Sequence, residues 1–191
     1  MVQDRFESFY QLSQSVNSGR DYRIRVDDRG SPMAVIAPHG GRIELRTSDI
    51  ASSIAANVHS LYCFEGVMPN SFENLHITST KFDEPACLKL IATCDFVIAV
   101  HGMRGDEELV EIGGLDHDLK QFIQAELSGA GFNAVQAKRF PGLEPKNICN
   151  RGKRHKGVQL EISKGLRNSL AQNDEALSVF AECVRNSVKV D

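Results

Sequence analysis

The stretch Met33-Ala34-Val35-Ile36-Ala37-Pro38-His39-Gly40-Gly41-Arg42-Ile43-Glu44 decides the fold of this chain. Its first five residues are apolar and predict a short buried strand that ends in a histidine. The two glycines let the backbone turn sharply and approach other groups closely. A second apolar run, Phe96–Val100, is followed by His101 and Gly102 in the same way. Two predicted strands therefore end in a His-Gly pair, and a carboxylate follows the first.

This arrangement predicts a zinc site made of His39, Glu44 and His101. A catalytic zinc ion has three protein ligands of these types and keeps a fourth position open for water. Ligands of α/β sheets bind beyond the carboxyl ends of the strands, where both histidines fall. His76, within Leu75–Thr80, is the alternative third ligand. Otherwise it contacts a ligand side chain without binding the metal, or it contacts the substrate. It lies inside an apparent strand and not at its end, which favours His101.

Apolar periodicity predicts alternating strands and helices along the whole chain. The alternation is typical of an α/β fold, a three-layer open sandwich with a mixed, largely parallel sheet flanked by helices. We find no internal repeat or linker, and 191 residues suit a single catalytic domain spanning 1–191. The predicted strands are 22–26, 33–37, 61–64, 75–78, 96–100, 109–112, 133–137 and 158–162; the predicted helices are 4–16, 84–93 and those marked by the apolar faces 50–61, 119–127 and 176–184.

Composition excludes several classes of protein. A net charge of −3, with 41% hydrophobic and 25% charged residues, gives no global reason to expect nucleic acid as a partner. No apolar run reaches the roughly 18 residues of a membrane span, and the first residues, Met1–Arg5, form no apolar signal core. The five cysteines are scattered without a CxxC pair, as is typical of reduced thiols. We therefore expect a cytoplasmic protein without a membrane partner; its oligomeric state stays open.

Glu161 is the most unusual carboxylate of the sequence. In Val158–Ser163 the alternation places it on the face opposite the apolar residues. At the edge of a sheet this glutamate would lie in solvent. In a sheet covered on both faces it would be buried, with a raised pKa that suits a general base. The sequence alone leaves both interpretations open.

A basic segment, 146–156, precedes this strand in a chain that is acidic as a whole. Such a segment is commonly a solvated charged loop. Alternatively, it binds phosphate or carboxylate groups of an anionic partner. The charge does not choose between the two. Its cationic residues are Lys146, Arg151, Lys153, Arg154 and Lys156.

Taken together, the motifs resemble the phage-type poly-γ-glutamate hydrolase family, which is similar to compact zinc carboxypeptidases. The resemblance extends from about residue 20 to 168. Each motif alone is weak, but the ordered series is specific. The motifs are His39–Glu44, Thr47–Ala51, Tyr62–Gly66, Leu75–Asp83, Val100–Gly102, Gly113–Asp116, Asn147–Gly152 and Gly157–Ser163, followed by Gly165–Arg167.

The resemblance implies a hydrolase with one zinc ion per chain, held by His39, Glu44 and His101. It implies Glu161 as the general base that takes a proton from water and returns it to the leaving amine. Arg151, beside a predicted active-site strand, is expected to steady the developing oxyanion. The implied substrate is poly-γ-glutamate, an anionic polymer. The residues expected to bind it are His76, Asn150, Lys153, Arg154 and Lys156.

One local departure concerns Leu45-Arg46, where the family pattern leads us to expect Pro-Gly. The zinc ligands survive this change, whereas the loop shape and the substrate preference are open. A phage-encoded member would be released by host lysis. Some members carry a label linking them to phage replication, but no motif here supports a nucleic-acid role.

Two alternatives remain at this stage. One is another zinc amidohydrolase or carboxypeptidase that acts on small N-acyl or peptide substrates. The other is a non-catalytic polyanion- or nucleic-acid-binding protein that uses segment 146–156. If Glu161 is not the base, Glu65 and Asp83 are the next candidates. The sequence does not give endo or exo cleavage, or the stereochemistry of the glutamate that is accepted.

Overall fold

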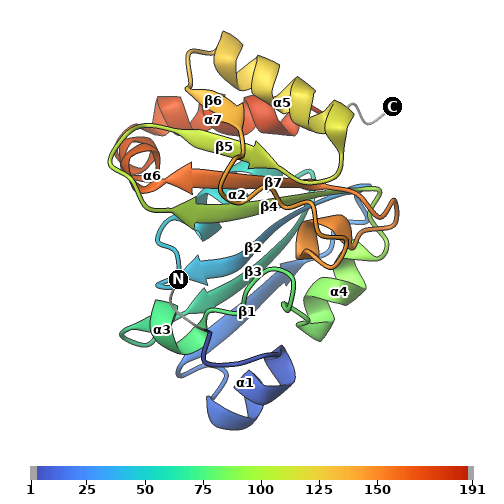
Figure 1. Cartoon of the computed structure of the whole chain (residues 1–191), viewed down its shortest axis with the longest axis vertical. Helices are drawn as coiled ribbons and strands as arrows, with labels where there is room; N and C mark the ends of the chain where they lie inside the picture. Colours follow the sequence, from blue (N-terminus) through green and yellow to red (C-terminus); the bar gives the residue numbers. More distant parts are fainter. Residues whose placement is uncertain (1–3, 189–191) are drawn as a thin grey trace.

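The computed structural model describes residues 4–188 and has a seven-stranded sheet between two layers of helices (Figure 1). The strand order is β1-β3-β2-β4-β7-β5-β6. β1 pairs antiparallel with β3, and β5 pairs antiparallel with β7, while the other neighbours are parallel. The predicted mixed, largely parallel α/β sheet is thereby confirmed.

The elements have the following bounds. The strands are β1 (Tyr22–Asp27), β2 (Met33–Gly41), β3 (Ser60–Gly66), β4 (Phe96–Met103), β5 (Val110–Gly113), β6 (Ala134–Gln136) and β7 (Val158–Ser163). The helices are α1 (Phe9–Ser15), α2 (Thr47–Ala55), α3 (Ser71–Leu75), α4 (Pro85–Ile91), α5 (His117–Gly129), the 3₁₀ helix η1 (Ile148–Asn150), α6 (Lys164–Gln172) and α7 (Asp174–Arg185).

Each face of the sheet packs on its own apolar core. One core joins the sheet to α2, α5, α6 and α7, and the other joins it to α1, α3, α4 and η1. Along β2, Val35 contributes to the first core, and its neighbours Ala34 and Ile36 contribute to the second. Because both faces are covered, β2 is apolar on both faces from Met33 to Ala37 and does not alternate. This explains the continuous run that begins at Met33.

The direction in which successive strands are added to the sheet changes at β2. The chain passes from β2 to β3 on one side and places β4 on the other, which is the kind of position where α/β sheets bind ligands. The pairing of β2 with β4 ends at Ile36 and Ala99. The register against β3 shifts between Ala37 and Gly40, around Pro38, which has no N–H to donate. The last residues of β2 therefore leave β4, and His39 lies there.

Some sequence predictions differ from the structure. The predicted strand 75–78 is wrong: α3 ends at Leu75, and residues 76–79 pair with no strand of the part described, 4–188. The helix predicted over 4–16 begins only at Phe9, and α2 ends at Ala55. Helix α6 was not predicted at all. None of the helices between residues 4 and 188 is long and apolar enough to cross a membrane.

Candidate metal centre

A tight turn after β2 brings Glu44 back to His39. The N–H of Glu44 donates to the carbonyl of His39 over 2.9 Å. Gly41 permits this turn because its φ is +61°, and a Cβ there would lie 2.5 Å from the carbonyl oxygen of Gly66. The Thr47 hydroxyl fastens the turn by donating to the carbonyl of Glu44 over 2.8 Å. The Gly-Gly pair is thus needed to fold the carboxylate over the end of its own strand.

Segment 76–79 contacts both histidines. His39 Nε2 lies 2.8 Å from the carbonyl oxygen of Ile77. A carbonyl only accepts, so this nitrogen carries a proton, and in the neutral ring Nδ1 is then the nitrogen with a lone pair for a metal ion. His101 Nε2 lies 3.3 Å from the Ser79 hydroxyl. Both rings are buried, and each turns its Nδ1 atom toward the other.

Ligand atoms of three residues converge in the space between these rings. His39 Nδ1 lies 3.1 Å from His101 Nδ1 and 3.2 Å from Glu44 Oε1. His101 Nδ1 lies 3.7 Å from Glu44 Oε2. Ligands bound tetrahedrally to zinc at about 2.0–2.1 Å are roughly 3.3 Å from one another. The three residues therefore form a group that fits one metal ion, with the nitrogen and oxygen donors that zinc takes.

The carboxylate of Glu44 is held in its charged form. Burial opposes ionisation, but His39 and His101 outweigh it and lower the pKa of Glu44 well below its usual range. The backbone N–H of Gly102 also donates to Oε2 over 2.8 Å. A buried anion between two imidazoles is an attractive place for a cation.

His76 lies next to this group but is oriented by a different partner. Its ring stacks on that of His39 at a centroid distance of 4.1 Å. Its Nδ1 lies 2.7 Å from Asp4 Oδ1, and its Nε2 lies 4.0 Å from Glu44 Oε1. Burial lowers the pKa of His76 to about 4, and the charge of His39 contributes. The predicted residue is thus near the centre, outside the three-residue group.

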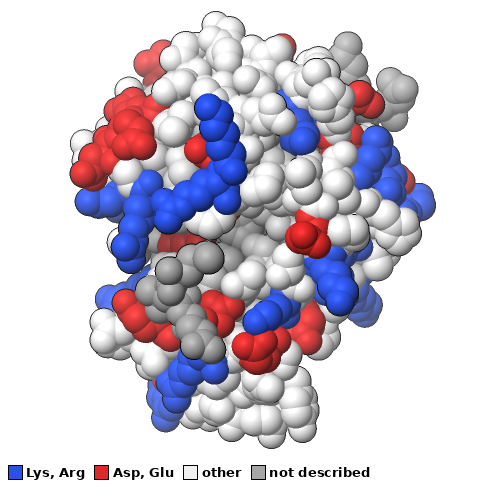
Figure 2. Space-filling model, viewed as in Figure 1, with Lys and Arg blue, Asp and Glu red and all other residues white. Residues whose placement is uncertain are grey.

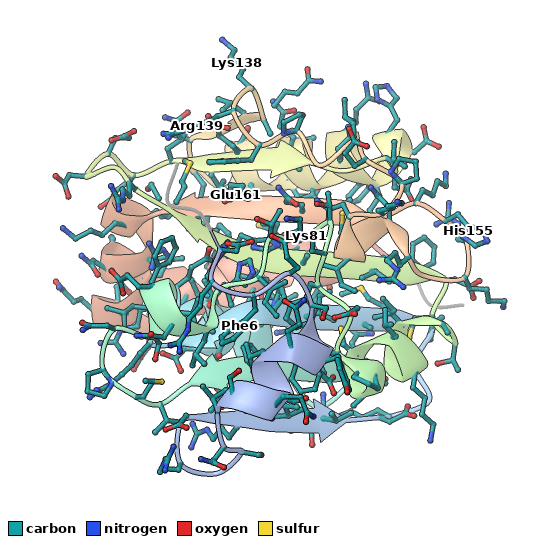
Figure 3. The ribbon with its side chains drawn as sticks, turned by 60° about the horizontal axis from the view of Figure 1, so that its bottom comes forward. Phe6, Lys81, Lys138, Arg139, His155 and Glu161 are labelled. Carbon is teal, nitrogen blue, oxygen red and sulfur yellow. The ribbon has the colours of Figure 1, made fainter. Side chains whose placement is uncertain are left out.

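Glu161 lies on β7 (Figure 3). In the parallel pair of β4 and β7 its register partner is His101. β7 is an inner strand, so the side chain is buried, with 7% exposure. Burial raises the pKa of Glu161 to about 8, and the negative charge of Glu44 adds to the rise. Gln159 Nε2 donates to Oε1 over 2.9 Å. Of the two interpretations that the sequence left open, the structure has the buried one.

The remaining acidic candidates have other partners. Glu65 accepts a hydrogen bond from Arg23 over 2.6 Å, and Asp83 accepts one from the N–H of Phe9 over 2.6 Å. These contacts tie Glu65 to β1 and Asp83 to α1. Neither carboxylate belongs to the three-residue group.

The first part of the basic segment borders a hollow of about 620 Å³, lined by Thr80, Pro145, Lys146, Asn150, Arg151 and His155. Thr80 adjoins Ser79, which contacts His101. Arg151 Nη1 donates to the carbonyl of Phe82 over 3.2 Å. Within residues 4–188, no hydrogen bond joins Arg151 to the three-residue group. The Asn150 amide binds loop backbone, donating to the carbonyl of Gly142 over 2.8 Å.

The structure does not bring Lys153, Arg154 and Lys156 to the histidines. Lys153 pairs with Asp95 at 3.2 Å, and both Arg154 and Lys156 pair with the buried Asp116. Arg154 also lies over the Phe96 ring, at the start of β4. Five strand residues, roughly 16 Å, separate that point from His101. The expected contact with substrate therefore has no support from their position.

Sequence reasoning assigned no role to two buried side chains beside the metal centre, Gln159 and Arg167. Gln159 is two residues before Glu161 on the same strand, so strand alternation was a usable signal. Its Oε1 accepts from Asn147 over 2.9 Å, and its Nε2 also donates to the carbonyl of Phe140. Arg167 belongs to the unpredicted α6, and only the resemblance pointed to it.

Comparisons with known proteins find one matching family model and several similar proteins. A family model described as poly-gamma-glutamate hydrolase matches residues 6–181. UPF0714 protein YndL of Bacillus subtilis (strain 168) is 36% identical over 172 residues, which are 88% of this chain and 68% of that protein. The SPbeta prophage-derived UPF0714 protein YoqZ of the same organism is 34% identical over 173 residues, 89% of this chain and 62% of that protein.

Two solved structures are similar over nearly the whole chain. A bacteriophage poly-gamma-glutamate hydrolase superposes with a TM-score of 0.90 and 30% identity, covering 97% of this chain and 96% of that one. A structure described as zinc-free YndL superposes with a TM-score of 0.91 and 33% identity, covering 97% of both chains. The predicted α/β open sandwich is confirmed by these matches.

Proposed function

The chain belongs to the poly-γ-glutamate hydrolase family, and we propose that it hydrolyses the γ-glutamyl amide bonds of poly-γ-glutamate with one zinc ion per chain. The observation that carries the metal part of the proposal is the convergence of His39, Glu44 and His101 on one point. The family supplies the substrate. The zinc-free description of the similar YndL structure supports zinc as the metal.

In this proposal His39, Glu44 and His101 would hold the zinc ion. Zinc supplies polarisation of the amide carbonyl and a water that is more acidic than bulk water. Glu161, on the strand next to His101, accepts a proton from the attacking water and returns it to the leaving amine. Its raised pKa, about 8, suits a group that must both take and give a proton near neutral pH. Gln159 holds one carboxylate oxygen, which fixes the orientation of the other.

The substrate is a polyanion, so the proposal needs cations along its path. Lys146 and Arg151, at the hollow beside Thr80, are the proposed carboxylate-binding residues, and steadying of the oxyanion by Arg151 stays a prediction. Figure 2 shows a band of Lys and Arg side chains on the side where the parallel strands end. A cationic surface of this kind draws anionic polymers toward the site.

Metal content of two variants tests the assignment of the ligands. We expect His101→Ala to lose most of its zinc, since removal of a ligand abolishes most of the affinity. His76→Ala is the matched control, because its ring is adjacent but outside the group; it should retain zinc. A folded His101→Ala protein with full zinc occupancy would overturn the assignment and transfer it to His76.

Substrate profiling tests the reaction. We expect the wild-type protein to shorten γ-linked polyglutamate and to leave the α-linked polymer intact. Equal cleavage of both, or cleavage only of small N-acyl amino acids, would favour another amidohydrolase. Salt-sensitive binding of the polymer without cleavage, unaffected by chelation, would indicate a non-catalytic polyanion-binding protein.

A further inference from the structure

We infer that Arg167 is a positioning residue of the metal centre. Arg167 lies on α6 and is buried, with 8% exposure. Its guanidinium joins three backbone segments, and each of these carries one of the residues assigned above to the reaction. The inference rests on the proposed metal site and goes beyond it, because Arg167 itself is neither a ligand nor a base in that proposal.

The three contacts are made with backbone carbonyls. Arg167 Nε donates to Ile162 over 3.0 Å, and Ile162 follows Glu161 on β7. Nη2 donates to Met103 over 3.2 Å, two residues after His101 on β4. Nη1 donates to Leu45, which follows Glu44 in the turn. The guanidinium is planar and its donors have a fixed geometry. It therefore sets the spacing between β7, which carries Glu161, β4, which carries His101, and the turn that carries Glu44.

Gly102 provides the space for this group. A Cβ built on Gly102 would lie 2.8 Å from Arg167 Cζ and 3.0 Å from its Nε. Any side chain at that position would displace the guanidinium. Glycine is therefore required after His101 because it leaves room for the Arg167 guanidinium. The glycines after His39 are required for a different purpose, since they permit the turn.

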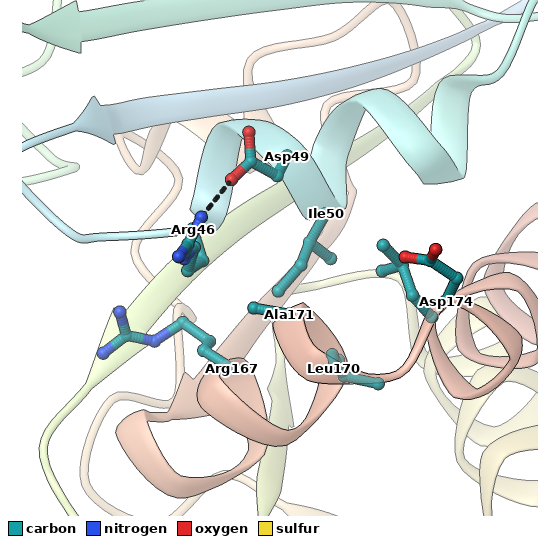
Figure 4. A pocket seen from close by; sticks show the side chains of 8 residues that line it. Arg46, Asp49, Ile50, Arg167, Leu170, Ala171 and Asp174 are labelled. Carbon is teal, nitrogen blue, oxygen red and sulfur yellow. Dashed lines mark ion pairs between the residues drawn. The ribbon is translucent and has the colours of Figure 1, made fainter.

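The charge of Arg167 is buried without a direct carboxylate partner among its hydrogen bonds. Arg167 lines a small pocket of about 130 Å³ together with Leu177 and Asp174. Figure 4 shows the side chain extending away from Leu170 and Asp174, on the side of Arg46. Burial lowers the pKa of Arg167, while the charges of Glu44 and Glu161 act in the opposite direction. A buried cation is retained at a cost, and the three carbonyls, with two carboxylates nearby, are the environment that offsets it.

A purely structural clamp is the competing explanation, and the chain offers a matched control for it. Arg185 on α7 also donates to backbone carbonyls, from Nε to Ile54 over 3.0 Å and from Nη2 to Ser53 over 2.6 Å. These carbonyls lie at the end of α2, away from the turn that carries Glu44. Arg167→Met and Arg185→Met therefore remove the same kind of contact at two different places.

The experiment measures zinc affinity, the visible spectrum of the cobalt-substituted protein and the kinetics on γ-polyglutamate for wild type and both variants. Loss of a group that orients metal ligands typically weakens metal affinity or activity by about 10–100-fold. We expect that range for Arg167→Met, together with an altered cobalt spectrum and a lower kcat. We expect Arg185→Met to lose thermal stability while keeping wild-type zinc affinity and spectrum.

A second pair of variants covers the case in which Arg167→Met does not fold. Arg167→Lys keeps the charge but reaches fewer carbonyls, and Gly102→Ala displaces the guanidinium without removing it. Both should weaken zinc binding and alter the cobalt spectrum. Wild-type zinc affinity and spectrum in every folded variant at Arg167 and Gly102 would overturn this inference alone. Absence of zinc binding by the wild-type protein would instead overturn the proposed function.

Discussion

Replacing Glu161 with glutamine should change the pH dependence of stability in the metal-free protein. The pKa of Glu161 is about 8 when folded, against an ordinary value of 4.5. Between these values the folded state binds more protons than the unfolded state, so the free energy of unfolding falls as pH rises from about 4.5 to 8. Glutamine does not ionise, and Glu161→Gln therefore escapes this loss.

The size of the effect follows from the pKa difference. Titration of Glu161 alone would correspond to about 5 kcal/mol across this pH range. Only the part of this titration that falls between pH 5 and pH 8.5 is sampled, and Glu161 is partly titrated at both ends of that range. We therefore expect the free energy of unfolding of Glu161→Gln, relative to that of wild type, to be roughly 2–4 kcal/mol higher at pH 8.5 than at pH 5.

Urea unfolding of chelator-treated proteins at pH 5 and pH 8.5 measures this difference by linear extrapolation. Glu126→Gln, at an exposed position of α5, is the control and should follow the wild-type protein. In the zinc-loaded enzyme, kcat of Glu161→Gln should fall by about 10²–10⁴-fold with zinc content and KM nearly unchanged. Parallel stability curves for wild type and Glu161→Gln would refute the buried, proton-binding glutamate. A near wild-type kcat would refute its role as base.

Three further outcomes are expected. Arg46→Gly should raise the free energy of unfolding by about 1 kcal/mol in urea unfolding, because Arg46 has a left-handed φ of +76°; a less stable variant would contradict this. Lys146→Ala combined with Arg151→Ala should raise KM for the polymer and flatten its salt dependence, measured by initial rates at several ionic strengths. Lys153→Ala should leave KM unchanged. A rise in KM equal to that of the double variant would indicate that the part of segment 146–156 around Lys153 also binds the substrate. Mixing zinc with the chelated protein should raise Tm, by mass action on the folded state; an unchanged Tm would argue against the site.

The layered fold was predictable because apolar runs of strand length report burial on both faces. The two His-Gly pairs and Glu44 were also identifiable, since strand ends in a parallel sheet meet at one edge. Segment 75–78 misled the prediction. Leu75 and Ile77 are both buried with a polar residue between them, as in a strand. The segment is fixed instead by the N–H of Thr78, which donates to Asp4, and by the next residue, Ser79, whose carbonyl accepts from the N–H of Ile148. Such partners are distant in sequence.

Helix α6 escaped prediction for a different reason. Ser163 closes β7 and at once caps the helix by accepting from the N–H of Leu166 over 3.2 Å. No loop separates the two elements, and Gly165 near the helix start weakens the helical signal. The placement of the basic segment was not predictable either. Its first cations line the hollow and its last ones pair with Asp116, and both depend on tertiary contacts. A cluster of charged residues in the sequence does not show which of their side chains point toward the site.

Titration of the chelated protein with zinc, with depolymerisation of γ-polyglutamate as the readout, tests the central claim most directly. The account predicts negligible activity without metal, a linear rise up to one equivalent of zinc per chain and a plateau beyond it. Depolymerisation that is equally fast in the chelated protein would contradict it. So would a protein that binds one equivalent of zinc and leaves the polymer intact.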